Sequence, residues 1–209
     1  MTCLETSVPR SEIRILLDRG RTIEFHGPAD ITHETTDAVV NAAHSSLLGG
    51  GGVDGAIHEA GGPAILAECR RIVGQIGSLP AGQAVITTGG HLTAKHVIHT
   101  VGPVYRDGKS GEAEKLASCH RESIRLADQH AIKSLSFPAI STGAFGFPSS
   151  EAATIAISST VEALAFTNHV SRVRFVLFDI ATLRTYTRAA EQLQNLNPVF
   201  SYRVEKGSP

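Results

Sequence analysis

A run of four glycines, Gly49 to Gly52, lies where a strand is expected to pass directly into a helix. The apolar residues Ala38 to Val40 predict a buried strand that ends at Asn41, and the segment after the run can form a helix. Glycines accept positive φ and have no Cβ, so consecutive N–H groups can converge on phosphate oxygens beside the helix start. The run therefore predicts an anion-binding loop, with Asn41 before it and Asp54 after it close to the same ligand.

The glycine run has a flexible linker as its alternative interpretation. It matches neither common nucleotide-binding pattern, because no Lys-Ser/Thr follows it and its spacing is not Gly-x-Gly-x-x-Gly. A linker would be flanked by polar residues, whereas Leu47 and Leu48 precede these glycines and Val53 and Ile57 follow them. We therefore expect a loop that is packed in place.

Composition narrows the classes of protein that fit this chain. With 209 residues and 42% hydrophobic content, one domain can build its own core without a metal or a disulfide. A net charge of −1 and a pI near 6.8 argue against a broad nucleic-acid surface and a polybasic membrane signal. Cys3, Cys69 and Cys119 match neither a disulfide framework nor a zinc pattern, and no apolar signal segment follows Met1. No apolar run approaches the roughly 20 residues of a membrane helix, so we expect a cytoplasmic protein without a membrane partner.

Short β-branched runs alternate with segments of helical periodicity along most of the chain. Strands are expected at residues 13–17, 22–25, 38–41, 84–88, 96–101, 134–138 and 175–178. Helices are expected at residues 64–73, 112–130, from 149 onward and 181–194. This alternation predicts an α/β fold, a three-layer α/β/α sandwich with a mixed, mostly parallel central sheet, over residues 12–195. Residues 1–11 and 196–209 are then expected to be an N-terminal and a C-terminal tail.

Polar loops follow several of the expected strands. Asp30, Asn41 with the glycines, the segment Ser141 to Pro148, and Asp179 each come after a strand. In such sheets ligands bind beyond the carboxyl ends of the strands, so we expect these loops to form one rim. The segment Ser141 to Pro148 adds hydroxyls and two glycines before a helix, which predicts a second set of phosphate donors, unless it is an ordinary glycine turn.

Two aromatic residues, Phe145 and Phe178, lie beside these loops in the sequence. Phe178 is placed to stack on a base and Phe145 on a sugar, while packing in the core is the alternative for an aromatic ring at a strand end. Together with two phosphate-binding loops, the rings predict a site for two phosphates between two ring systems.

The chain resembles the macrodomain family, and in particular its MacroD-type branch, over roughly residues 12 to 195. The resemblance is carried by Asn41-Ala-Ala, Gly49 to Asp54, Gly55-Ala-Ile-His58, His99-Thr-Val-Gly-Pro103 and Phe137-Pro-Ala-Ile-Ser-Thr-Gly-Ala-Phe-Gly-Phe-Pro148. Macrodomains bind ADP-ribose, and MacroD-type enzymes hydrolyse O-acetyl-ADP-ribose and remove single ADP-ribose units from acidic protein side chains. The resemblance implies a hydrolase without a cofactor or metal, whose partners are ADP-ribose, its esters and mono-ADP-ribosylated proteins. A non-catalytic ADP-ribose reader is the alternative.

The resemblance also implies roles for individual residues. Asp54 would be the catalytic carboxylate and Asn41 would bind the distal ribose, while His44 stands where MacroD-type enzymes usually carry a second asparagine implicated in activity. Asp30 and the main chain of Ile31 would hold the adenine. Phe178 would stack on the adenine, and the diphosphate and distal ribose would be wrapped by Gly50, Gly51, Gly52, Val53, Ser141, Thr142, Gly143, Ala144 and Phe145.

Several residues keep a second interpretation. Asp54, which we expect to orient or partly deprotonate a water, also suits a helix N-cap, and His58 suits a packed structural histidine better than a base. Pro28-Ala29 replaces the glycine that the family usually has before Asp30, and Phe145 replaces a frequent tyrosine. A zinc site on His91, His96 and His99 is disfavoured, because the last two face opposite ways on a strand and no cysteine is close in sequence.

Overall fold

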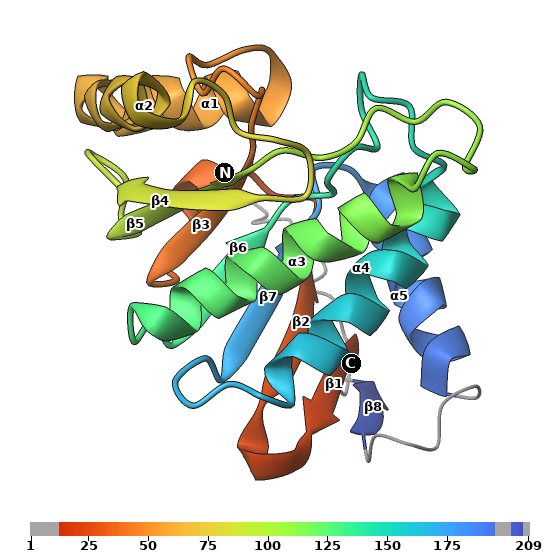
Figure 1. Cartoon of the computed structure of the whole chain (residues 1–209). Helices are drawn as coiled ribbons and strands as arrows, with labels where there is room; N and C mark the ends of the chain where they lie inside the picture. Colours follow the sequence, from red (N-terminus) through yellow and green to blue (C-terminus); the bar gives the residue numbers. More distant parts are fainter. Residues whose placement is uncertain (1–12, 195–201, 207–209) are drawn as a thin grey trace, which may run out of the picture.

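The computed structural model describes residues 13–194 and 202–206, which form one eight-stranded sheet between two layers of helices. The strand order is β4-β5-β3-β6-β7-β2-β1-β8 (Figure 1). The strands are β1 (Ile13–Leu17), β2 (Thr22–His26), β3 (Ala38–Ala42), β4 (Ala84–Thr88), β5 (His96–Thr100), β6 (Ser134–Phe137), β7 (Arg172–Val176) and β8 (Tyr202–Lys206). The helices are α1 (Gly52–Gly61), α2 (Pro63–Ile76), α3 (Glu112–Gln129), α4 (Ser149–Leu164) and α5 (Ile180–Gln194), with short 3₁₀ turns η1 (Asp18–Gly20) and η2 (Ile31–His33).

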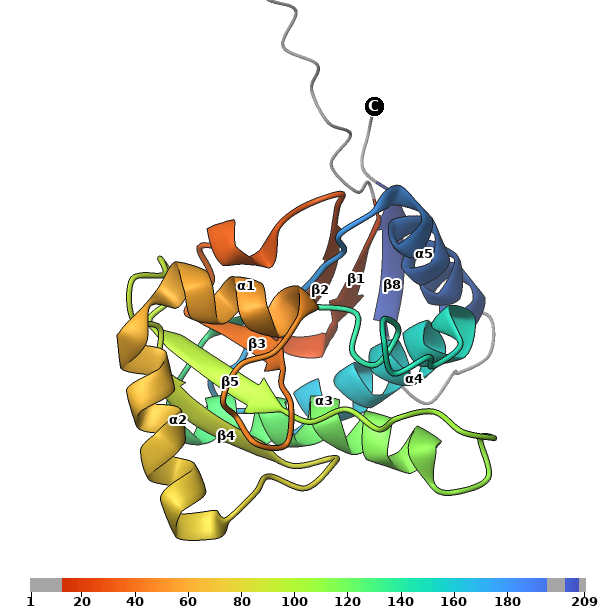
Figure 2. The ribbon, with the colours of Figure 1, turned by 90° about the horizontal axis from the view of Figure 1, so that it is seen from above.

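The five central strands, from β5 to β2, are parallel, and the outer pairs β4–β5, β2–β1 and β1–β8 are antiparallel. Figure 2 shows α1 and α2 on one side of the sheet and α3, α4 and α5 on the other. The predicted three-layer α/β/α sandwich with a mixed, mostly parallel sheet is therefore confirmed.

Each face of the sheet has its own hydrophobic core. Under α1 and α2, Ile57 and Ile65 are fully buried together with Val97 of β5. Under α3 to α5, Phe25 and Phe175 stack with their ring centroids 5.8 Å apart. Strands buried on both faces read as continuous apolar runs, which is why Ala38 to Val40 carries no alternation.

The expected C-terminal tail is wrong in one part, because Tyr202–Lys206 forms β8 and pairs antiparallel with β1 along all five of its residues. The run is short and, although the turn signal Asn197-Pro198 precedes it, three of its five residues are charged, so its strand character depends on the edge of β1 more than on its own pattern. The expected N-terminal tail, residues 1–11, lies outside the described residues. Among the helices described, none is long and apolar enough to cross a membrane.

The sheet topology collects the polar loops at one end. The segments after β2, β3, β6 and β7 leave from the carboxyl ends of parallel strands, as the sequence predicted. In the β3–β5 pair, Asn41 lies opposite His99, which brings a polar pair into the sheet beside these loops.

Candidate active site

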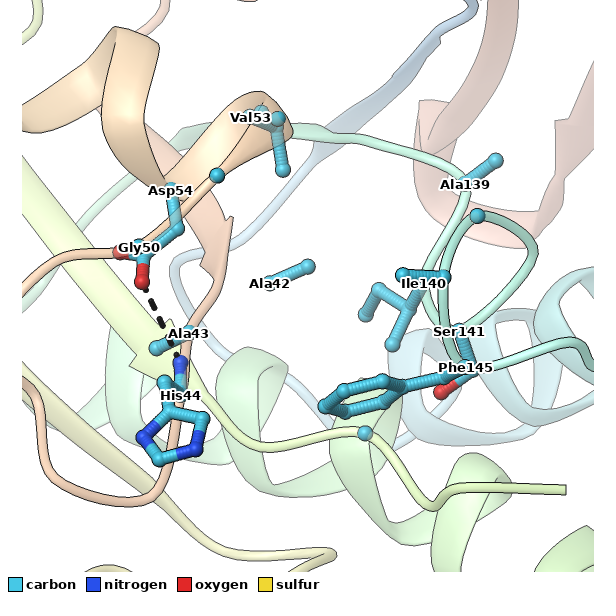
Figure 3. Close-up of a pocket in the computed structure, with 15 residues that line it drawn as sticks. Ala42, Ala43, His44, Gly50, Val53, Asp54, Ala139, Ile140, Ser141 and Phe145 are labelled. Carbon is cyan, nitrogen blue, oxygen red and sulfur yellow. Dashed lines mark hydrogen bonds between the residues drawn. The ribbon is translucent and has the colours of Figure 1, made fainter.

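Two adjoining cavities lie at this end of the sheet. The first, of about 380 Å³, is lined by Asp54, His44, the glycine loop and the segment after β6, and we call it the Asp54 cavity (Figure 3). The second, of about 470 Å³, is lined by Asp30, Ile31 and Phe178, and we call it the Phe178 cavity. Gly52, Val53, Ala139 and Gly143 line both cavities, so the two form one continuous cleft.

The glycine loop reaches the cleft in a conformation that favours glycine at particular positions. Gly49 and Gly52 have φ of +82° and +61°, in the left-handed region. A Cβ on Gly50 would lie 3.1 Å from Oδ2 of Asp54, and a Cβ on Gly55 would lie 2.5 Å from the carbonyl oxygen of Gly50. The loop is therefore pressed against Asp54 and α1, as expected for a packed loop rather than a linker.

Helix α1 begins at the cleft without a side-chain cap. Gly51 occupies the N-cap position, and no side chain within the described part of the chain accepts a hydrogen bond there. The first N–H groups of a helix need acceptors from outside, and an anion at the positive end of the helix dipole supplies them. The start of α1 therefore suits a phosphate.

Asp54 lies in the first turn of α1, is 3% exposed and lines the cavity. Its Oδ1 accepts from Nδ2 of Asn41 at 2.7 Å, and its Oδ2 accepts from the main-chain N–H of His44 at 3.3 Å, which is drawn in Figure 3. These partners come from β3 and the loop after it, not from the start of α1. The N-cap interpretation of Asp54 is therefore wrong, since Gly51 holds that position.

Asn41 lies beneath the cleft rather than on its wall. It is fully buried, lines neither cavity, and its Oδ1 has no hydrogen-bond partner among the described residues. Besides Asp54, its Nδ2 lies 3.1 Å from Nδ1 of His99. Burial lowers the pKa of His99 to about 3, so this imidazole is neutral near pH 7.

His58 and His99 are the polar residues that sequence reasoning left out of the site. His58 stands one turn after Asp54, with Nε2 3.5 Å from Oδ1 of that carboxylate, and its ring packs against His99 at 5.8 Å. The spacing of Asp54 and His58 at i and i+4 signals the first contact. The proximity of His99 depends on β3 and β5 being neighbours, for which the sequence holds no local signal.

His44 is exposed and faces the Asp54 cavity, but its ring is held by its own loop. Its Nδ1 lies 3.0 Å from Oγ of Ser46 and 3.3 Å from the main-chain N of Ser46. Because that main-chain N–H can only donate, Nδ1 is an acceptor. The structure thus links His44 to Asp54 through the main chain, and not through the imidazole.

The segment after β6 forms the opposite wall of the cleft. Ser141 has a φ of +65°, and its carbonyl oxygen accepts from the N–H of Phe147 at 3.0 Å, which closes the loop. Oγ of Ser141 is buried and has no partner among the residues that the structure describes. Of the predicted residues, Ser141, Gly143, Ala144 and Phe145 line the Asp54 cavity, and Thr142 and Gly143 line the Phe178 cavity.

The Phe178 cavity contains the residues predicted for a base. Phe178 is 82% exposed, so it is not a core residue and its ring is free to stack. Oδ1 of Asp30 accepts from the N and Oγ1 of Thr32, at 2.9 and 2.8 Å, and the main-chain bond in particular lowers the pKa of Asp30. Both bonds use Oδ1, which leaves Oδ2 for a ligand donor. Ala29 lines the cavity as well.

Asp179 and Thr182 also line this cavity, and of the two the sequence predicts only Asp179 as a rim residue. The N–H of Thr182 donates to Oδ1 of Asp179 at 2.8 Å, and this bond in particular lowers the pKa of Asp179. Asp179 is thus a cap at the start of α5.

One cluster has the composition of a metal site. His58, Cys69 and His99 each offer one ligand atom, and these atoms lie within 4.8 Å of one another. The sequence placed no cysteine near His99, but Sγ of Cys69 lies 3.7 Å from its Nε2. That Nε2 is also 2.9 Å from Oγ1 of Thr87, and Nδ1 faces Asn41, so both nitrogens already take part in hydrogen bonds. Burial raises the pKa of the Cys69 thiol to about 11, which disfavours the thiolate that a metal needs.

Comparison with known proteins identifies the class of protein that this fold and cleft define. The macro domain family model matches residues 40–156, and the chain belongs to the macro domain family. A macro domain-containing protein of Cupriavidus necator is 56% identical over 161 residues, which cover 77% of this chain and 92% of that protein. A Klebsiella pneumoniae protein named O-acetyl-ADP-ribose deacetylase is 51% identical over 159 residues, 76% of this chain and 91% of that protein.

A solved structure of the Oceanobacillus iheyensis macrodomain with ADP has the same fold. It superposes with a TM-score of 0.81 at 39% identity, over 88% of this chain and 99% of that one. The resemblance inferred from the sequence motifs is therefore confirmed at the level of the family.

Proposed function

We propose that this protein binds ADP-ribose along the cleft and hydrolyses acyl esters of its distal ribose. The substrates would be O-acetyl-ADP-ribose and mono-ADP-ribosyl esters on acidic protein side chains. The observation that carries the proposal is the position of Asp54, a buried carboxylate on the cavity wall, held by Asn41 and His44 directly behind a glycine loop and an uncapped helix start. The similarity to proteins named O-acetyl-ADP-ribose deacetylase supports the same substrate.

The two cavities suit the two ends of the ligand. In the Phe178 cavity, an adenine would stack on Phe178, and its amino group would donate to Oδ2 of Asp30. The diphosphate would lie between the N–H groups at the start of α1 and those of the segment Ser141 to Phe145. This arrangement leaves the distal ribose in the Asp54 cavity, beside the carboxylate.

The chemistry requires a fixed ester and a positioned water more than a strong acid. Asp54 would orient the water and take its proton as the water oxygen attacks the ester carbonyl carbon. The bond between that carbon and the ribose oxygen then breaks, and the ribose oxygen receives the proton that Asp54 took from the water. The products are ADP-ribose and a free carboxylic acid. Main-chain N–H groups of the two loops would stabilise the negative charge of the phosphates next to the reacting water.

A non-catalytic reader is the second candidate, and His44 favours it. The imidazole of His44 is hydrogen-bonded to Ser46, and it is the main-chain N–H of His44 that bonds Asp54. The ring therefore does not supply the amide that MacroD-type enzymes usually have there. Such a reader would use the same two cavities without turnover.

Binding and turnover separate these candidates when both are measured on one preparation. ADP-ribose should bind in a calorimeter and raise the melting temperature, because only the folded state binds it. Release of acetate from O-acetyl-ADP-ribose and of ADP-ribose from an ester-linked acceptor protein would then support the hydrolase. Binding without release supports the reader, and no binding at millimolar ADP-ribose contradicts both.

A further inference from the structure

A chain of four buried side chains runs from β4 to the cavity wall: Thr87, His99, Asn41 and Asp54. Asn41 and His99 are 0% exposed, and Thr87 and Asp54 are each 3% exposed. The links are 2.9 Å from Thr87 to His99, 3.1 Å from His99 to Asn41 and 2.7 Å from Asn41 to Asp54. Because water is excluded, every donor among these four side chains needs an acceptor within the protein.

The carboxylate fixes the orientation of the Asn41 amide. An ionised carboxylate has acceptors only, so the amide atom 2.7 Å from Oδ1 of Asp54 has to be Nδ2. The same Nδ2 lies 3.1 Å from Nδ1 of His99. An amide nitrogen has two protons, and one goes to each partner.

The amide in turn fixes the tautomer of His99. A neutral imidazole carries one proton, and Nδ1 has to accept from Asn41, so the proton is on Nε2. On that side, Oγ1 of Thr87 gives its only proton to the carbonyl oxygen of Thr88 at 3.0 Å and is free to accept from Nε2. Sγ of Cys69, 3.7 Å from Nε2, is a weak acceptor as well as a weak donor and is compatible with the same tautomer. Asn41 therefore sets the tautomer, Thr87 accepts from it, and the low pKa of His99 keeps the ring neutral.

We propose that His99 is a positioning residue that makes Asn41 an acceptor-only group for the substrate. Both protons of Nδ2 are used inside the protein, whereas Oδ1 is buried and has no partner among the described residues. Asn41 itself lines neither cavity, but Ala42 and Asp54 beside it line the Asp54 cavity. A hydroxyl that enters between these two residues would donate to Oδ1, whereas Asn41 cannot donate to an ester carbonyl or a phosphate. This inference rests on the proposed function, because the hydroxyl that it assigns belongs to the distal ribose.

The tautomer can be measured on the free protein, independently of any ligand. In a long-range ¹H–¹⁵N spectrum of protein labelled at histidine, the His99 ring should show a protonated Nε2 and a bare Nδ1, and it should remain neutral from about pH 8 down to about pH 5. A protonated Nδ1 would overturn the proposal. If the protein neither binds ADP-ribose nor hydrolyses its esters, the proposed function fails, while this spectrum still decides the tautomer.

A matched pair of variants tests the positioning role. His99→Asn places an amide oxygen near the position of Nδ1, whereas His99→Gln places its amide near Nε2 and removes the acceptor for Asn41. His99→Gln should lower kcat for O-acetyl-ADP-ribose and the affinity for ADP-ribose about tenfold each, the size of one lost buried hydrogen bond. His99→Asn should retain most of both.

Free ADP is the control ligand, because it has both phosphates and the adenine but no distal ribose. Its affinity should be the same in the parent and both variants. Equal losses for ADP and ADP-ribose, or equal behaviour of His99→Gln and His99→Asn, would overturn the positioning role and leave His99 as an ordinary core residue.

Discussion

The main-chain N–H of His44 donates to Oδ2 of Asp54, whereas the imidazole of His44 is turned to Ser46. This contact, which holds the carboxylate together with that of Asn41, is therefore independent of the side chain at position 44. A substitution there can alter the group that faces the cavity and still preserve the position of Asp54.

His44→Asn should raise the turnover of O-acetyl-ADP-ribose with little change in ADP-ribose affinity. An amide there both donates and accepts, and a group at the reacting end contributes more to the transition state than to ground-state binding. The check is kcat and KM for the parent and His44→Asn, with His44→Ala as the matched control that lacks both functions. If the asparagine and alanine variants have the same kcat, the amide has no role.

Phe178→Ala should weaken ADP-ribose binding by about 1–3 kcal/mol, the range for stacking of a base on an aromatic ring. Phe166→Ala is the matched control, because Phe166 is 84% exposed, similar to the 82% of Phe178, but lines neither cavity. Calorimetry with ADP-ribose compares the two. Equal affinity in both variants would remove Phe178 from the base-binding site.

The buried His120 should make the protein less stable as the pH falls. Desolvation lowers the pKa of His120 from 6.5 to about 4, so the unfolded chain gains a proton in this window that the folded protein does not. The stability present above pH 6.5 is therefore lost on acidification, at up to about 1.4 kcal/mol per pH unit.

His120→Phe should reduce the pH dependence of the free energy of unfolding by up to about 1.4 kcal/mol per pH unit. Urea denaturation at several pH values between about pH 6 and pH 4.5 measures this dependence. The replacement ring can keep the packing against Phe137, whose centroid lies 5.2 Å away. His130→Phe removes an exposed imidazole from the end of the same helix and serves as the control. An unchanged slope in His120→Phe would contradict the assignment.

Chelation should leave ester hydrolysis intact. Asp54 is held by hydrogen bonds, and both nitrogens of His99 are engaged with Asn41 and Thr87. Activity after dialysis against EDTA is the measurement, and Cys69→Ser should behave as the parent does. Loss of activity that added zinc restores would instead assign a metal to His58, Cys69 and His99.

The layers of the fold and the rim of polar loops could be predicted because both follow from local sequence patterns. The alternation of apolar runs and helical segments was enough for the layers, and Asp30, the glycine loop and Ser141 met on one rim because each follows a parallel strand. The strand Tyr202–Lys206 was missed because its partner β1 begins at Ile13, at the other end of the chain.

The hydrogen bonds behind Asp54 could not be predicted in the same way. His99 lies 58 residues from Asn41, and Cys69 lies 30 residues from His99. These contacts arise from the β3–β5 pairing and from α2 packing on the sheet, which are tertiary features without a local signal. The role of Gly51 at the N-cap, which frees Asp54 from capping, likewise depends on the residue at which α1 begins.

The central claim is that Asp54 acts on the reacting water, and Asp54→Asn tests it most directly. The variant exchanges the carboxylate for an amide of nearly the same size, with Glu162→Gln, an exposed residue of α4, as the control. We predict that Asp54→Asn lowers kcat for O-acetyl-ADP-ribose about 10²–10⁴-fold while ADP-ribose still binds, as for the loss of a positioned acid or base. Hydrolysis by Asp54→Asn at the rate of the parent and of Glu162→Gln would contradict the account.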